Sequence, residues 1–101
     1  MSVGDLIEIE AMDETGAWVD HLSLHAVKVN KSRSVESAAA GGEQVADTVE
    51  FTVRWNRFLP DVEADKPRYR IRWRGRTFDV RGYDDFMYRH RQVKLTGVSY
   101  G

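Results

Sequence analysis

The alternation of apolar and polar residues along the chain predicts a protein built mostly of β-strands. Residues 7–11 place Ile, Ile and Ala between glutamates, which is typical of a strand with one buried face. A longer strand follows from residue 18 to about residue 29. Its apolar phase shifts between Ala26 and Val27, which indicates a bulge or a strand that changes sheets. The strand at residues 48–55 shows the most regular alternation.

Residues 69–80 predict a β-hairpin with a defined register. If Arg74 and Gly75 form a two-residue turn, the flanking apolar residues pair on one face. The expected pairs are Trp73 with Arg76, Ile71 with Phe78, and Tyr69 with Val80, and on the other face Arg70 with Asp79 and Arg68 with Arg81. The arginines therefore project from the face opposite Tyr69, Ile71 and Trp73.

Connections between these strands complete the expected architecture. They are a turn at residues 13–16, a long loop at about 30–46 with a short helical turn around 35–40, a loop at 58–67, and a polar connection at 83–92 with a helical turn near 84–88. A last strand begins at Val93, with a bulge at Gly97. About six strands, with one long loop after the second, predict a small antiparallel β-barrel or sandwich spanning residues 1–101 as a single domain.

Composition and charge narrow the classes of protein. The chain has 101 residues, of which 42% are hydrophobic and 31% charged, as in ordinary globular domains. It contains no cysteine, which excludes disulfides and thiolate chemistry, and no apolar run reaches the roughly 18 residues of a membrane-spanning helix. Residues 1–53 carry ten acidic and three basic groups, a net charge of −7, whereas residues 54–101 carry six and twelve, a net charge of +6. Such a split is consistent with charged partners, or with faces that meet in neighbouring copies.

No candidate catalytic or cofactor-binding group completes a site. His21 and His25 lie four apart on a strand, roughly 13 Å from each other by the strand rise, without a third ligand in register. Asp84 and Asp85 resemble a carboxylate pair for metal-assisted catalysis but lack a further carboxylate, and a turn explains them better. We therefore expect no enzyme activity, no metal and no cofactor.

The row of arginines at positions 68, 70, 72 and 74 has three interpretations. It is a solvated face neutralised by Asp79 and the acidic N-terminal strand, a protein interface, or a nucleic-acid surface. The expected inward direction of Tyr69 and Trp73 weighs against the third, because those rings could not then stack on bases.

Four segments, in this order, resemble the head–tail joining proteins of tailed phages, also called head-closure, head-completion or stopper proteins. They are Gly16–Asp20 running into Leu24–Val27, Val49–Trp55, Arg70–Gly82 and Arg89–Leu95. The third is most similar to the family, whose hairpin turns at Arg-Gly after a short basic and aromatic strand. The first strand, with Glu8 and Glu10, is acidic where the family often has arginines.

The resemblance implies a structural virion protein that forms a ring at the head–tail interface. Such a ring closes the portal channel after DNA packaging and offers the surface for tail attachment. The implied partners are further copies of the chain, a portal adaptor above, tail terminator or tail proteins below, and packaged DNA. The implied location is the host cytoplasm during assembly and then the connector of the virion. Alternatives are a tail-terminator or tail-completion ring protein, or a small nucleic-acid-binding β-barrel.

Two groups of residues carry the expected contacts. The loop that lines or plugs the channel would contain Lys31, Arg33, Glu36, Gly41, Gly42 and Glu43. The assembly interface would contain Glu8, Glu10, Glu50, Arg68, Arg70, Arg72 and Arg74, with the acidic residues of one copy facing the arginines of another.

Overall fold

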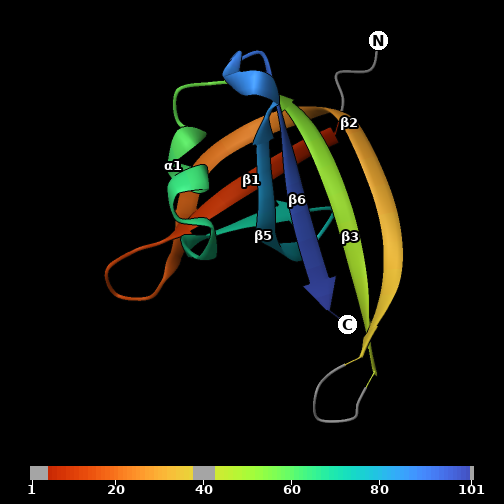
Figure 1. Ribbon diagram of the computed structural model, residues 1–101. Coiled ribbons are helices and arrows are strands. Elements are labelled where there is room, and N and C mark those ends of the chain that lie inside the picture. Colours follow the sequence, from red (N-terminus) through yellow and green to blue (C-terminus); the bar gives the residue numbers. More distant parts are fainter. Residues whose placement is uncertain (1–4, 38–42, 101) are drawn as a thin grey trace.

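The chain closes into an antiparallel β-barrel with the strand order β1-β2-β3-β6-β5-β4 (Figure 1). The computed structural model describes residues 5–37 and 43–100, and the side chains of residues 5–32 and 46–99. The strands are β1 (Asp5–Met12), β2 (Trp18–Ser37), β3 (Glu43–Arg54), β4 (Tyr69–Trp73), β5 (Arg76–Asp85) and β6 (Gln92–Tyr100). Short helices are α1 (Pro60–Ala64), η1 (Lys66–Arg68) and η2 (Phe86–Tyr88). The predicted small antiparallel barrel is confirmed.

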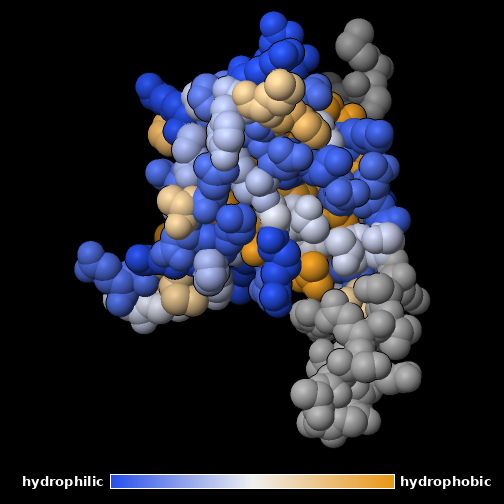
Figure 2. Space-filling view, in the orientation of Figure 1, coloured by the Kyte–Doolittle hydropathy of each residue, from blue (hydrophilic) through white to orange (hydrophobic). Residues whose placement is uncertain are grey.

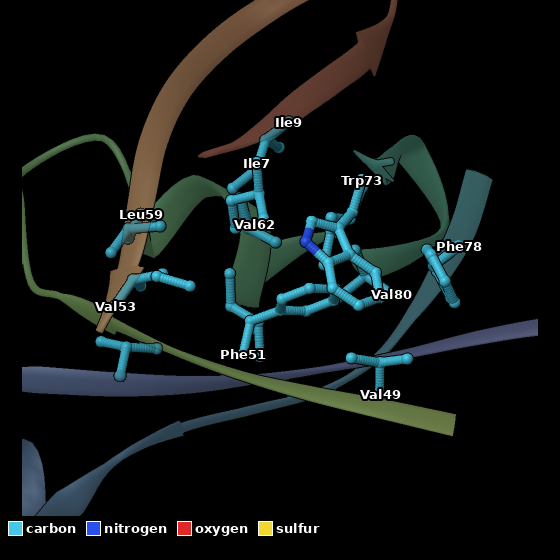
Figure 3. Packing of buried hydrophobic residues seen from close by; sticks show 14 residues of the cluster. Ile7, Ile9, Val49, Phe51, Val53, Leu59, Val62, Trp73, Phe78 and Val80 are labelled. Carbon is cyan, nitrogen blue, oxygen red and sulfur yellow. The ribbon is translucent and has the colours of Figure 1, made fainter. Parts of the chain in front are cut away.

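The barrel interior is filled by the apolar side of each alternating strand. Phe51 on β3 lies at its centre (Figure 3), and its ring meets those of Trp73 and Phe78 edge-on, at centroid distances of 5.5 and 6.0 Å. Leu59 and Val62, before and within α1, are fully buried against the same cluster. Each such side chain contributes roughly 1.5–3 kcal/mol by leaving water, so the alternation read from the sequence is the main source of stability.

Strand β2 changes partners halfway along its length. Ala26 is the point of exchange, because it pairs with Asp5 of β1 and with Val53 of β3. The register shifts between Ala26 and Lys28, which leaves Val27 as the extra, exposed residue of a bulge. The phase shift in the sequence predicted this bulge, and the structure confirms it.

The prediction of a long loop at residues 30–46 is wrong for most of these residues. Strand β2 continues to Ser37 and β3 begins at Glu43, and the two pair without interruption from Lys28 to the Ser37–Glu43 pair. Residues 35–37 are therefore strand and not a helical turn, whereas residues 38–42 lie outside the described part of the chain. The polar run Lys-Ser-Arg-Ser at residues 31–34 concealed the strand, because it lacks the apolar alternation by which a strand is recognised in a sequence.

The predicted β4–β5 hairpin is confirmed in turn and register. Trp73 pairs with Arg76, and Arg70 with Asp79. Arg74 and Gly75 have φ angles of 51° and 75°, as a two-residue hairpin turn of the primed type requires. Arg68, expected on this strand, instead ends η1, because the preceding Lys-Pro pair starts a 3₁₀ turn.

Other connections also differ from expectation. The loop expected at residues 58–67 contains α1 and the start of η1, and each of them has a proline among its first two residues. The expected polar connection at 83–92 is strand as far as Asp85, followed by the single helical turn η2. The bulge lies in β5 at Arg81 and not at Gly97. Gly97 lacks a side chain for another reason, since a Cβ there would lie 2.8 Å from Cβ of Phe78.

Candidate assembly surfaces

The outer face of β1 and β4 carries a salt bridge between two of the expected interface residues. Glu10 and Arg70 are cross-strand partners, and Nε of Arg70 donates to Oε1 of Glu10 over 2.7 Å. The guanidinium of Arg70 also lies 4.3 Å from the centroid of the Trp18 ring. Glu10 is only 8% exposed, so its charge depends on Arg70 for compensation. This pair is satisfied inside one chain.

The other arginines of the predicted row have separate local contacts. Arg74 pairs with Asp5 over 3.0 Å, and Nη2 of Arg68 donates to the carbonyl oxygen of Met12 over 3.0 Å. Arg72 is exposed and stands opposite Glu8 in the β1–β4 register. Of the three interpretations of the arginine row, the structure therefore favours the first, in which the acidic N-terminal strand neutralises the arginines. A role of these residues in assembly stays a prediction.

Glu50 lies apart from the other expected interface residues. It is on β3, where Nζ of Lys94 on the neighbouring strand β6 approaches its Oε2 to 3.7 Å. Cross-strand ion pairs of this exposed kind contribute little to stability. Glu50 therefore belongs to the β3–β6 face and not to the group around Arg70.

The residues expected to form a plug loop lie on a β-ribbon. Lys31, Arg33 and Glu36 are positions of β2 and Glu43 is the first residue of β3, while Gly41 and Gly42 fall outside the described residues. Strand β3 pairs with β6 only as far as Ala46–Tyr100, whereas β2 and β3 pair on to Ser37–Glu43. Residues 35–37 and 43–45 therefore form a two-stranded extension that leaves the barrel at its lower end in Figure 1.

The base of this ribbon is held by two contacts to the β4–β5 hairpin. Nη1 of Arg76 lies 2.7 Å from Oδ2 of Asp47, and Nζ of Lys31 lies 5.3 Å from the centroid of the Trp73 ring. Both contacts join β2 or β3 to the opposite wall of the barrel. They tie the base of the ribbon to the barrel.

The candidate catalytic and metal-binding side chains of the sequence lie apart from one another. The described residues contain no group of three His, Cys, Asp or Glu side chains able to hold a metal ion. His21 contacts the Tyr69 ring and the carbonyl of Phe58. Asp85 is buried and bonded to His90, whereas Asp84 is exposed, so the two carboxylates do not converge. No helix within the described ranges has the length and apolar character to cross a membrane.

One surface was missed by the sequence analysis. The run Phe86, Met87 and Tyr88, assigned to a polar connection, is exposed to 43%, 79% and 72%. Three adjacent large apolar or aromatic residues within a charged stretch were the available signal. Without the fold, they could equally have been a buried strand.

The described part of the chain is thus a closed six-stranded antiparallel barrel from which a two-stranded ribbon projects. The sequence profile of the phage head completion proteins matches residues 5–97. This chain belongs to that family, and is a structural head-completion protein of a virion. The predicted relationship is confirmed.

The chain was also compared with curated proteins and with solved structures. No curated protein matches the chain significantly. A solved chain from "Virion of native gene transfer agent (GTA) particle" superimposes with a TM-score of 0.64 at 16% identity, covering 100% of this chain and 97% of that one. At this identity the similarity establishes a shared fold.

Proposed function

We propose that the protein assembles as a ring at the head–tail interface, closes the portal channel after DNA packaging and provides the attachment surface for the tail. Membership of the head completion family supports a place in the virion. The partners would be neighbouring copies, a portal adaptor on one side, tail proteins on the other, and DNA in the channel. Assembly would take place in the host cytoplasm, and the whole of residues 1–101 would act as one domain without catalytic activity.

The observation that carries the closing role is the β2–β3 ribbon. It extends beyond the last β6 pair, and its base is fixed to the barrel wall by the Arg76–Asp47 ion pair. A ribbon held at its base can reach toward the axis of the ring and so close the channel. A conformational change at that base would move the ribbon aside and open the channel. Lys31, Arg33, Glu36 and Glu43 are strand positions of this ribbon, with Gly41 and Gly42 in the sequence between its strands.

A nucleic-acid-binding role through the arginine face is disfavoured by the direction of its aromatic residues. Trp73 is 5% exposed and Tyr69 is half-buried, so neither ring stands free on the arginine side. Single-strand binding by β-barrels depends on exposed rings that stack on bases. No observation favours a tail-terminator role over a head-completion role.

The test is a shortened ribbon that leaves the barrel intact. Replacing residues 35–45 with Asn-Gly joins Ser34 to Ala46, which are cross-strand partners, through a turn suited to a two-residue hairpin. We expect heads that still contain the protein but lose packaged DNA, measured as the ratio of DNA to capsid protein. The matched control inserts Asn-Gly into the β1–β2 turn, after Thr15, where no effect on DNA retention is expected.

Unchanged DNA retention by heads that contain the shortened protein would refute the closing role. Absence of even the wild-type protein from purified particles would refute the proposed function as a whole.

A further inference from the structure

The turn that contains η2 is an exposed apolar projection with a fixed backbone. Met87, Tyr88 and His90 have φ angles of 54°, 52° and 55°, in the left-handed region that non-glycine residues rarely adopt. Strained backbone of this kind persists only where the surroundings hold it, and it is concentrated at functional sites. Two contacts of His90 hold the backbone of this turn in place. Its backbone N–H donates to Asp85 over 3.0 Å, and its ring stacks on Trp55 at 4.5 Å.

The side chains that this backbone presents are of the kind that dominates protein interfaces. Met87 is the most exposed large apolar residue of the described chain, and Phe86 and Tyr88 flank it. Figure 2 shows an apolar group surrounded by hydrophilic residues in the region where Figure 1 draws η2. Aromatic residues, Met and Arg are enriched at interface centres. Folding alone gains nothing from exposing these side chains.

Arginines beside the turn lack carboxylate partners. A hollow of about 510 Å³ is lined by Arg54, Phe86, Arg89, Arg91 and Gln92. Among the residues whose side chains are described, no carboxylate lies within 4.0 Å of these three guanidinium groups. Three arginines without a carboxylate partner therefore lie together around this hollow, next to the exposed apolar side chains of the turn.

We propose that this turn, with Phe86, Met87, Tyr88, Arg89, Arg91 and Arg54, is a docking knob for a different protein of the particle. The partner surface has an apolar hollow that receives Met87 and is edged by carboxylates that pair with the arginines. Charge complementarity of this kind sets orientation and suppresses wrong partners. The fixed backbone lowers the entropic cost of docking, because the knob is ordered before it binds.

The position of the docking knob favours a protein over DNA as its partner. Strand β3 runs from the ribbon at Glu43 to the docking knob at Arg54, so the two lie at opposite ends of the molecule, roughly 35 Å apart by the strand rise (Figure 1). If the ribbon reaches the channel, as the proposed function holds, the docking knob lies away from the DNA. A phosphate backbone would also leave Met87 without an apolar partner.

The first experiment replaces Tyr88 with the photoreactive analogue p-benzoylphenylalanine in the full chain during particle assembly. We expect irradiation to join position 88 to a different particle protein, at a segment where peptide mapping finds Asp or Glu beside apolar residues. A cross-link to another copy of this chain, a nuclease-sensitive product, or no product in particles that contain the chain would overturn the docking knob and leave the proposed function standing. Absence of the chain from particles would overturn both.

The second experiment separates docking from folding. The double variant Arg89→Glu, Arg91→Glu should keep the wild-type thermal midpoint but enter particles at least tenfold less. Arg81→Glu is the matched control, since Arg81 is an exposed arginine on β5 outside the docking knob, and it should enter particles normally. Normal incorporation of the double variant, or equal loss with the control, would refute the role of these arginines.

Discussion

Glu10 and Arg70, sixty positions apart in the sequence, form a 2.7 Å salt bridge across strands β1 and β4. The guanidinium is held on a second side by the ring of Trp18, at 4.3 Å from its centroid. Strands β1 and β4 are the first and last members of the strand order, so this pair lies at the point where the sheet closes on itself. An ion pair between the acidic first strand and the arginine row therefore helps to hold together the two strands that close the barrel.

Loss of either member of this pair should destabilise the fold. Arg70→Met leaves the nearly buried carboxylate of Glu10 without a donor, which costs roughly 1–3 kcal/mol. The double variant Glu10→Gln, Arg70→Met should lose less than the sum of the single variants. Urea unfolding of the four proteins measures the coupling. Additive losses would mean that the two side chains do not interact in solution.

Gly97 should be intolerant of even one methyl group. A Cβ at this position would lie 2.8 Å from Cβ of Phe78, which is attached directly to the β5 backbone and cannot rotate away. We expect Gly97→Ala to cost about 1–3 kcal/mol of unfolding free energy, as overpacked cores do. Gly82→Ala is the comparison, because its Cβ would lie 3.0 Å from Oγ1 and 3.1 Å from Cβ of Thr96, a milder overlap that a shift of a few tenths of an ångström relieves. Equal losses for both variants would contradict this packing argument.

The sequence predicted those parts of the fold whose signals are local. The β4–β5 hairpin was predictable because Arg74-Gly75 specifies its turn and the flanking apolar residues specify its register. The bulge at Val27 was predictable because it shifts the apolar phase of one strand. Each of these features can be recognised within about ten residues.

Features that depend on distant partners were not predictable in the same way. The β2–β3 ribbon is not recognisable in the sequence because residues 30–46 lack apolar alternation, and only the pairing of the two strands defines it. Neutralisation of the arginine row by the first strand was one of three open interpretations, and only the β1–β4 register favours it. The docking knob was missed because nothing in the run Phe86–Tyr88 indicates that the barrel leaves it outside.

The Tyr83 phenol should make stability depend on pH at alkaline values. Burial, and then the charges of Glu63 and Asp85, raise its pKa from 10.0 to about 12. A raised folded pKa means that the folded state holds the proton more tightly, so the stabilising contribution is complete below pH 10.0 and is lost as pH rises through about 12. The unfolding free energy of the wild type should therefore fall over this interval, and less steeply in Tyr83→Phe. Tyr88→Phe, at an exposed position, is the control, and an equal slope in all three proteins would contradict the assignment.

Arg72 offers the cleanest test of the predicted assembly interface, because it is exposed on the same face as Arg70 without that residue's buried salt bridge. Its reversal to Glu places two like charges opposite each other at Glu8 and position 72, which should cost less than about 1 kcal/mol on an exposed strand pair. If this face contacts a neighbouring copy, Arg72→Glu should reduce incorporation into particles several-fold while the thermal midpoint stays within a few degrees of the wild type. Arg72→Gln removes the charge without reversing it and should give an intermediate loss. Incorporation of Arg72→Glu at the wild-type level, measured by quantitative mass spectrometry of purified particles, would remove Arg72 from the assembly interface.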